Sequence, residues 1–373
     1  MNKFPVGMKI YSNDWLLKYR MSPVQIAAFL AEMGINFVIT HSQHLPMQDN
    51  AVSSAMSAAD SARYTIETDM EFRDELRKCG IRYFACMNVG FDPQAARENP
   101  EWLPVDQHGR LGDQTDWYVG IPPSNHAFID HKSRQLCRAV EALQPDGIHL
   151  GFARWPGFWE TWLPGMPAKD LRGFCYAPAS MQQFSEWAGL DIPTNDSVAC
   201  ATMINASYRA LFTDWKCAVT GQMIGQLKTA ARGIMPQIPV AINTVPFDIS
   251  ELNGAVEQVL GQRHSTLADT VDFFEVMAYH QILRRSINWP AQISARIKQR
   301  TGQTTYCTLQ TGVHYLSGMH KNAGRAGRIT AADFAKMVET VLSADLDGLC
   351  FFSLSDFLGG PDSAAFADIV RAI

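Results

Sequence analysis

The fold is decided by the segment Asp146-Gly-Ile-His-Leu-Gly-Phe-Ala-Arg-Trp-Pro-Gly-Phe-Trp-Glu160. It begins with small and apolar residues, 147–152, which are typical of a buried strand, and it continues into a charged stretch rich in tryptophan. In a parallel barrel, buried strands end in loops that hold the functional groups. Tryptophan rings offer flat apolar faces there, and carboxylate and guanidinium groups make polar contacts. We therefore expect a strand that opens into a binding site, against the alternative of a core strand followed by a loop of buried tryptophans.

Short apolar runs with β-branched or aromatic content recur along the chain and predict eight strands. They are residues 6–11, 36–40, 82–88, 147–152, 240–245, 273–279, 304–309 and 348–354. Amphipathic segments separate most of them, and residues 22–34, 70–79 and 330–342 are predicted helices with suitable first or last residues. Apolar strands that alternate with helices indicate a parallel sheet covered by helices. The sequence therefore predicts a single (β/α)8 barrel domain, a TIM barrel, over residues 1–373.

Two of the connections are much longer than the others. Residues 91–127 follow the third predicted strand, residues 155–205 follow the fourth, and both are rich in Trp and Tyr. Long connections in a barrel usually build the functional mouth, so we expect both insertions to surround the site. No glycine-rich phosphate-binding sequence follows the first strand, which disfavours a dinucleotide-binding sheet.

Composition narrows the class of protein. The chain is 47% hydrophobic and 18% charged, as globular proteins are, and its net charge of −5 gives no basic surface for nucleic acid. No apolar run approaches the length needed to cross a membrane. The eight cysteines are scattered without a C-x-x-C pair, and the amino terminus has no secretory pattern. We therefore expect reduced thiols and a cytoplasmic location.

Several segments occur in the order seen in a known group of proteins. They are residues 99–109 (NPEWLPVDQHG), 146–150 (DGIHL), 174–184 (FCYAPASMQQF), 189–193 (GLDIP) and the M-x-Y of Met277 and Tyr279. This order resembles that of the bacterial TIM-barrel proteins known as family 10-like or hypothetical glycosyl hydrolases, in the glycoside hydrolase superfamily. The resemblance spans roughly residues 35–356 and implies a barrel that acts on carbohydrate. Ala177 and Ser180 replace two cysteines of the group's pattern.

One position departs from that group at a place where chemistry is expected. Relatives commonly have an aspartate directly after the D-G-I-x-[LF] of strand four, where a nucleophile or a substrate-fixing carboxylate would sit. This chain has Gly151. The resemblance then implies either that the catalytic carboxylates lie elsewhere or that the usual chemistry is lost or changed.

Glycoside hydrolysis needs two carboxyl groups, one to protonate the leaving oxygen and one to attack or to activate water. The candidates near predicted strand ends are Glu160, Asp14 and Asp356. Glu160 is the first choice for the acid, because its aromatic neighbours would raise its pKa. The alternative for Glu160 is a salt bridge to Arg154 or Arg172, and for the two aspartates it is helix capping.

Other polar and aromatic residues at strand ends fit a ligand with many hydroxyl groups. The predicted substrate-binding residues are His41, Asn88, Arg154, Trp155, Trp159, Asn243, Tyr279 and His280. Glu275 is expected deeper in the barrel, on the same face as Tyr279, where it would need Arg or backbone partners.

These observations predict a glycoside hydrolase-like enzyme for a short oligosaccharide or small glycoside. One alternative, suggested by Gly151, is a sugar-binding barrel with attenuated catalysis. Another is a metal-dependent hydrolase or isomerase that uses His41, His44 and His280. We expect a carbohydrate substrate, no metal or other cofactor, and no nucleic-acid or membrane partner. Association into a homo-oligomer is left open.

Overall fold

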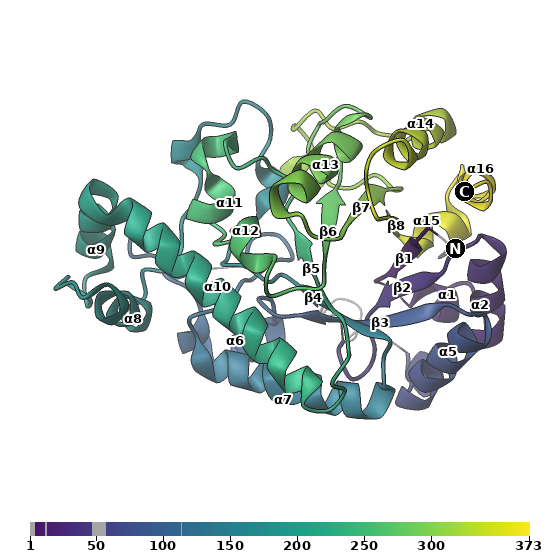
Figure 1. The fold of residues 1–373 in the computed structure, drawn as a ribbon, viewed down its shortest axis with the longest axis horizontal. Coiled ribbons are helices and arrows are strands. Elements are labelled where there is room, and N and C mark those ends of the chain that lie inside the picture. Colours follow the sequence, from purple (N-terminus) through teal and green to yellow (C-terminus); the bar gives the residue numbers. More distant parts are fainter. Residues whose placement is uncertain (1–3, 12, 47–56, 113) are drawn as a thin grey trace.

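A computed structural model describes residues 4–11, 13–46, 57–112 and 114–373 and shows a closed barrel of eight parallel strands (Figure 1). The strands are β1 (Val6–Ile10), β2 (Phe37–Thr40), β3 (Arg82–Asn88), β4 (Gly147–Gly151), β5 (Val240–Thr244), β6 (Phe273–Ala278), β7 (Thr305–Gln310) and β8 (Gly348–Phe352). They pair in chain order, and β8 pairs back with β1. The predicted (β/α)8 barrel is confirmed, with strand bounds that differ from the prediction by one or two residues.

Helices cover the barrel between consecutive strands. They are α1 (Asp14–Leu17), α2 (Pro23–Glu32), α4 (Ala58–Arg63), α5 (Ile66–Lys78), α6 (Pro93–Glu98), α7 (His126–Leu143), α8 (Pro178–Ala188), α9 (Ser197–Met203), α10 (Arg209–Arg232), α11 (Ala255–Gln258), α12 (His264–Leu267), α13 (Trp289–Thr301), α14 (Ala331–Leu342), α15 (Leu354–Gly359) and α16 (Ser363–Arg371). The helix predicted over residues 70–79 is α5, which starts earlier because the Thr65 hydroxyl caps its polar first turn. Thr330 caps α14 as expected, by accepting a hydrogen bond from the Asp333 N–H.

At the amino-terminal end of the barrel, the same side-chain to backbone hydrogen bond occurs before every second strand. The residue directly before β2, β4, β6 and β8 accepts a hydrogen bond from a backbone N–H at the start of the preceding strand: Asn36 from Val6 (3.0 Å), Asp146 from Tyr83 (2.8 Å), Asp272 from Val240 (2.7 Å) and Asp347 from Thr305 (2.9 Å). Asp146, the first residue of the D-G-I segment, therefore holds β3 and β4 together at the amino-terminal end of the barrel. In barrels of this kind that end contributes to stability, and the opposite end carries the active site.

Side chains fill the barrel interior in layers. The layer nearest the amino-terminal ends of the strands contains four packed rings, those of Phe37, Phe84, Phe273 and Tyr306. Glycines on neighbouring strands make room for these rings, because a Cβ on Gly7 would lie 2.1 Å from the Phe37 ring and one on Gly147 would lie 2.1 Å from the Phe84 ring. The small residues at the start of the D-G-I segment are therefore required by packing inside the barrel.

The next layer contains a fully buried ion pair. Lys9 of β1 and Glu275 of β6 are both 0% exposed, and Lys9 Nζ lies 2.7 Å from Glu275 Oε2. His149 Nε2 lies 3.1 Å from the same oxygen, and the Thr308 hydroxyl donates to the other one. Burial raises the pKa of Glu275, but the Lys9 charge and the hydrogen bonds outweigh this effect and lower the pKa to about 2. The predicted deep position of Glu275 is confirmed, whereas its main partner is a lysine.

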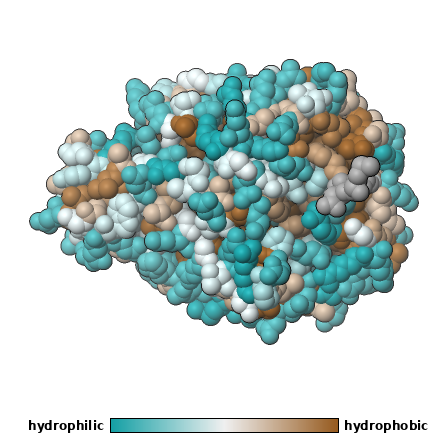
Figure 2. All heavy atoms as spheres, viewed as in Figure 1, coloured by the Kyte–Doolittle hydropathy of each residue, from teal (hydrophilic) through white to brown (hydrophobic). Residues whose placement is uncertain are grey.

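Helices α8 and α9 form an extension beside the barrel (Figure 1). Their apolar side chains pack with the first part of α10 and with Trp155 in a cluster separate from the main core. Figure 2 shows hydrophobic residues among hydrophilic ones on this extension, where Trp187 of α8 and Val198 of α9 are about half exposed (46% and 50%). Within the described ranges, no helix combines the length and the apolar character that a membrane span requires.

The first prediction concerns the buried ion pair. Replacing Lys9 with Met leaves the Glu275 carboxylate buried without its cation, so we expect the free energy of unfolding to fall by about 3–5 kcal/mol. The double variant Lys9→Met, Glu275→Gln removes both charges and should recover most of this loss. Urea unfolding of the wild type and both variants measures the difference. Equal losses in the single and double variants would show that an unpaired charge is not the cause.

Candidate functional site

The carboxyl ends of all eight strands meet at one cavity, which we call the first cavity. Its lining includes Tyr11 after β1, His41 after β2, Asn88 of β3, Phe152 and Arg154 after β4, Asn243 of β5, Met277 and Tyr279 at β6, His314 and Tyr315 after β7, and Phe352 of β8. Trp117 from one insertion and Trp159 and Glu160 from the other complete it, together with Ile282. The space inside the cavity and at its open mouth together measures about 670 Å³.

Aromatic rings form most of the wall of this cavity. Tyr279 stacks on Phe352 with ring centroids 4.7 Å apart, and Trp159 lies 6.0 Å from Tyr279. Across the cavity, Trp117 Nε1 donates a hydrogen bond to the Tyr315 hydroxyl at 2.9 Å. Rings fixed by neighbouring rings and by hydrogen bonds give a rigid apolar surface against which a flat ligand face can pack.

The described residues that line this cavity also carry buried polar atoms without partners. Five buried polar atoms of lining residues have no hydrogen-bond partner in the described part of the chain: His41 Nε2, Asn88 Nδ2, Arg154 Nε, Glu160 Oε2 and His314 Nε2. A buried polar group without a partner costs free energy, so such groups are usually satisfied by a ligand or by water. Water, or a ligand with several hydrogen-bonding groups, would satisfy these five atoms.

Glu160 is the titratable residue of the cavity whose pKa is best placed for proton transfer. Its side chain is buried, and burial raises its pKa to about 7, although the charges of Arg154 and Arg325 oppose the shift. Within the described ranges Glu160 forms no ion pair; Arg172, the other proposed partner, pairs with Asp106 at 2.9 Å. Glu160 is therefore protonated up to about neutral pH.

The segment that presents Glu160 is held in place by two arginines. A 3-10 turn, Trp159–Thr161, contains Glu160, and Arg325 Nη2 donates to the Glu160 backbone oxygen at 2.8 Å. Arg154 Nη1 donates to the Gly157 oxygen at 2.6 Å, and its guanidinium lies over the Phe152 ring at 5.4 Å. Arg154 thus supports the loop, while its buried Nε has no partner in the described part of the chain.

The buried ion pair contacts the floor of the cavity through Tyr279. Lys9 Nζ donates to the Tyr279 hydroxyl at 3.3 Å, one layer below the cavity. A lysine ammonium has no acceptor, so Tyr279 must accept in this bond and keeps its own hydroxyl hydrogen for another partner. Tyr279 is therefore oriented as a donor.

Gly151 faces the barrel interior at this floor. A Cβ there would lie 2.9 Å from Asn88 Oδ1 and 3.8 Å from Asn243 Nδ2, two residues that line the cavity. The position directly before it on the other face, Leu150, is fully buried between sheet and helices. The absence of a side chain at Gly151 thus makes room for the Asn88 amide, which would have to shift if a Cβ were added.

Two predicted binding residues lie away from the cavity. Trp155 is fully buried; its Nε1 donates to the Lys216 oxygen at 2.9 Å and its ring packs 5.2 Å from Trp215. His280 is buried outside the lining, and burial lowers its pKa to about 4, with Asp333 of α14 as its nearest opposing charge. The structure therefore places both side chains outside the lining of the first cavity, with Trp155 packed against α10.

The two aspartates predicted as catalytic also lie outside the lining of the cavity. Asp356 completes the cap of α15, where its Oδ2 accepts hydrogen bonds from the Ser353 N–H (3.1 Å) and the Thr311 hydroxyl (2.7 Å). Asp14 is the first residue of α1. For Asp356 the alternative of helix capping is therefore correct.

Several lining residues are missing from the predicted set. Tyr11 and Phe352 share the interior face of their strands with Lys9 and Cys350, so strand alternation was a signal for both. Trp117 and Tyr315 lie in irregular loops, where no period indicates the direction of a side chain.

The histidines do not form a metal site within the described ranges. His41 lines the cavity, His44 is partly exposed, and His280 faces α14. No group of three or more His, Cys, Asp or Glu side chains there has the arrangement to hold a metal ion. Burial lowers the pKa of His41 to about 3, so its ring is neutral; with Nδ1 against the Leu45 oxygen (3.3 Å), Nε2 can accept a hydrogen bond.

No protein-family model matches the sequence. No curated protein matches it either. Among solved structures, the chain is similar to the PgaB (BpsB) glycoside hydrolase domain from Bordetella bronchiseptica, with a TM-score of 0.66 and 14% identity over 98% of both chains. At this identity the likeness shows that the two proteins share the (β/α)8 barrel fold.

Two longer proteins share this barrel. The chain resembles α-L-fucosidase isoenzyme 2 from Paenibacillus thiaminolyticus (TM-score 0.58, 17% identity), with 100% of this chain and 49% of that one covered. It also resembles the β-galactosidase from the psychrophilic Marinomonas ef1 (TM-score 0.63, 11% identity), with 99% and 58% covered. The chain thus spans about half the length of these two enzymes, and at these identities the likeness shows the fold.

The raised pKa of Glu160 predicts a pH effect on stability. Between its usual pKa of 4.5 and about 7, the folded protein holds a proton that the unfolded chain releases, so wild-type stability falls as pH rises through this window. Glu160→Gln removes the titration, and its stability relative to the wild type should rise by roughly 3 kcal/mol across the window. Urea unfolding between about pH 4 and about pH 8 measures this. A pH-independent difference would contradict the raised pKa.

The placement of Gly151 predicts a contrast between two substitutions on neighbouring residues. Gly151→Asp puts a carboxyl group at the cavity floor, where the Asn88 side chain can move aside, so we expect only a small loss of stability. Leu150→Asp buries a carboxyl group between sheet and helices and should cost several kcal/mol, about 3 or more. Thermal unfolding of both variants tests the assignment, which is wrong if the two losses are similar.

Proposed function

We propose that this protein is a glycoside hydrolase-like enzyme whose first cavity binds a short oligosaccharide or small glycoside, with Glu160 as the general acid. The proposal rests on one observation above all: the described residues that line a cavity walled by aromatic rings carry five buried polar atoms without a partner. A sugar ring offers both of the matching features, since its hydroxyl groups donate and accept hydrogen bonds while its C–H faces pack on rings. The barrel shared with glycoside hydrolase domains supports the same conclusion.

The acid step follows from the protonation state of Glu160. A general acid must be protonated at the working pH and must lose its proton easily during the reaction, which a pKa of about 7 allows. Protonation of the glycosidic oxygen lets the aglycone leave as a neutral alcohol, water adds to the anomeric carbon, and the proton that this water loses restores the Glu160 carboxyl group. Between the two proton transfers, the nearby charges of Arg154 and Arg325 stabilise the Glu160 carboxylate.

Tyr279 has a different part in the proposed site. Its hydroxyl accepts from Lys9 and can donate to a sugar oxygen above it. A donor polarised by a neighbouring ammonium binds an oxygen more strongly as negative charge develops there. Asn88 Nδ2 supplies a second donor, while His41 Nε2 supplies an acceptor for a sugar hydroxyl.

A second candidate function is a carbohydrate-binding barrel without hydrolysis. It is favoured by a specific observation: among the described residues that line the first cavity, Glu160 is the one carboxyl group. Hydrolysis by two carboxyl groups needs a second one to attack or to activate water, and neither Asp14 nor Asp356 supplies it from the lining. Binding without turnover separates this candidate from the first.

The proposed acid role predicts a dependence on the leaving group. A panel of aryl glycosides should begin with β-galactosides and α-L-fucosides, because proteins of similar fold are named for those activities. Glu160→Gln should lower kcat by about 10²–10⁴-fold for poor leaving groups, and by much less for acidic phenols that need no protonation. The control Glu101→Gln changes an exposed residue and should retain wild-type rates.

Two other outcomes would redirect this assignment. A small and uniform defect of Glu160→Gln across all leaving groups would make Glu160 structural. Binding of a glycoside by titration calorimetry, with no turnover by the wild type, would favour the binding barrel instead.

A further inference from the structure

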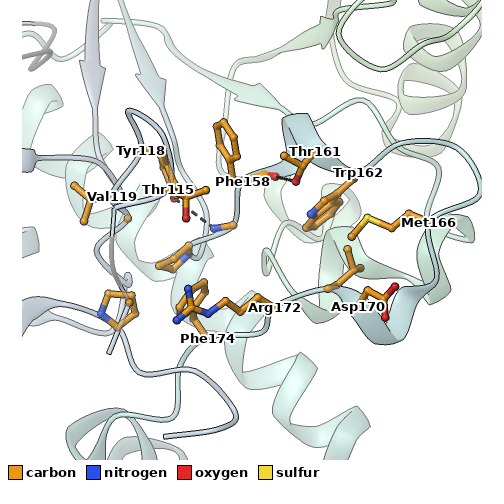
Figure 3. Close-up of a pocket in the computed structure, with 16 residues that line it drawn as sticks. Thr115, Tyr118, Val119, Phe158, Thr161, Trp162, Met166, Asp170, Arg172 and Phe174 are labelled. Carbon is orange, nitrogen blue, oxygen red and sulfur yellow. Dashed lines mark hydrogen bonds between the residues drawn. The ribbon is translucent and has the colours of Figure 1, made fainter. Parts of the chain in front are cut away.

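A second cavity lies on the other side of the segment that presents Glu160. Residues of one short stretch line both spaces: Trp159 and Glu160 line the first cavity, whereas Phe158, Thr161 and Trp162 line the second. With the open space at its mouth the second cavity measures about 730 Å³, similar to the first. Figure 3 shows the side chains of its lining arranged around this space.

Aromatic rings that pack against each other separate the two cavities. Trp117 lines the first cavity and its neighbour Tyr118 lines the second, and Phe158 packs edge-on against Trp117 with centroids 5.8 Å apart. The Tyr118 hydroxyl accepts a hydrogen bond from the Gly157 N–H at 3.4 Å, which joins the two insertions. The insertions thus create this second space between them, outside the barrel itself.

The lining of the second cavity combines rings with polar groups. Tyr118, Phe158, Trp162 and Phe174 supply the rings, and Thr115, Thr161, Asp170 and Arg172 supply hydroxyl and charged groups. This is the combination that suits the first cavity to a sugar, with apolar faces beside groups that donate and accept. The Thr161 hydroxyl already donates to the Phe158 oxygen at 2.7 Å, so it can still accept from a ligand.

The charges around the second cavity indicate a neutral ligand. Among its described lining residues the charged ones are Asp170 and Arg172, of opposite sign. The Arg172 guanidinium is in addition paired with the fully buried Asp106, with Nε 2.9 Å from Oδ2, and it stacks over the Phe174 ring at 4.9 Å. Asp106 also pairs with Arg110 at 2.9 Å, so Asp106 and Asp170 together balance the charges of Arg110 and Arg172. A fixed arginine in a set of charges that sums to zero orients a hydroxyl group but does not attract an anion strongly.

We propose that this second cavity is a further carbohydrate subsite, which binds a neutral pyranose unit next to the segment that holds Glu160. The unit is either a more distant sugar of the glycan in the first cavity or a separate sugar molecule. The inference rests on the proposed function in that it assumes a carbohydrate ligand, but it concerns binding in a different space and can be tested without turnover.

The test fills the second cavity from the side opposite to Glu160. Thr115→Tyr places a bulky side chain in the space, and the backbone there is fixed because Thr115 and Tyr118 exchange N–H···O bonds of 2.8 and 2.9 Å. The matched control is Leu111→Tyr, at a position of the same insertion that is 53% exposed and outside both linings. Both variants are made in a Glu160→Gln background, so that bound glycans are not consumed, and thermal unfolding confirms their folding.

The probes are an array of neutral mono-, di- and trisaccharides, followed by titration calorimetry of the sugars that bind. If the second cavity holds a further unit of one glycan, the trisaccharide should bind about tenfold or more tightly than its monosaccharide, and Thr115→Tyr should abolish this advantage. If it holds a separate sugar, two monosaccharides should bind per chain and Thr115→Tyr should leave one. The control Leu111→Tyr should behave like its parent in both cases.

Two results would overturn the subsite. One is a single monosaccharide per chain with no gain from longer glycans; the other is a gain or a second equivalent that Thr115→Tyr leaves intact. Absence of any sugar binding would overturn it as well. Failure of the proposed function looks different: Glu160→Gln would then keep full activity on aryl glycosides while the effect of Thr115→Tyr on binding remained.

Discussion

The buried pair of Lys9 and Glu275 is the constraint on which the interior of this barrel depends. Two charges removed from water must satisfy each other, and here His149 and Thr308 occupy the remaining hydrogen-bonding positions of the carboxylate. Because Lys9 also donates to Tyr279, the same pair fixes a ring of the cavity wall. The packed core and the candidate site are therefore parts of one hydrogen-bonded unit, which also connects His149 through Cys86 to the cavity residue Tyr11.

The fold and part of the site follow from simple periodicity. Eight apolar runs separated by amphipathic segments suffice for the barrel, and alternation along each strand then decides which side chains point inward. This is why Asn88, Asn243 and Tyr279 were predictable as residues of the cavity. Glu160 was predictable for a different reason, since a carboxyl group among aromatic residues is buried wherever the loop places it, and burial raises its pKa.

The remainder of the site depends on contacts that no local pattern contains. Trp155 and Trp159 are the same residue type in the same irregular loop, so the sequence does not distinguish them. In the structure Trp155 packs in the cluster with α8, α9 and α10, whereas Trp159 lines the first cavity. Asp356 follows a strand as a catalytic residue would, but the helix that begins there uses its carboxylate as a cap. Lys9, the partner of Glu275, is far away in sequence, and barrel closure alone brings β1 and β6 across from each other.

The place that Trp155 occupies has a consequence for the internal motions of the molecule. Its ring joins the loop after β4 to the apolar cluster of α8, α9 and the start of α10, a cluster distinct from the core around the barrel. A group of helices with its own apolar cluster can open as a cooperative unit while the strands of the barrel stay paired. The backbone amides of α8 and α9 then exchange their hydrogens with solvent through this local opening, at a lower free-energy cost than global unfolding requires.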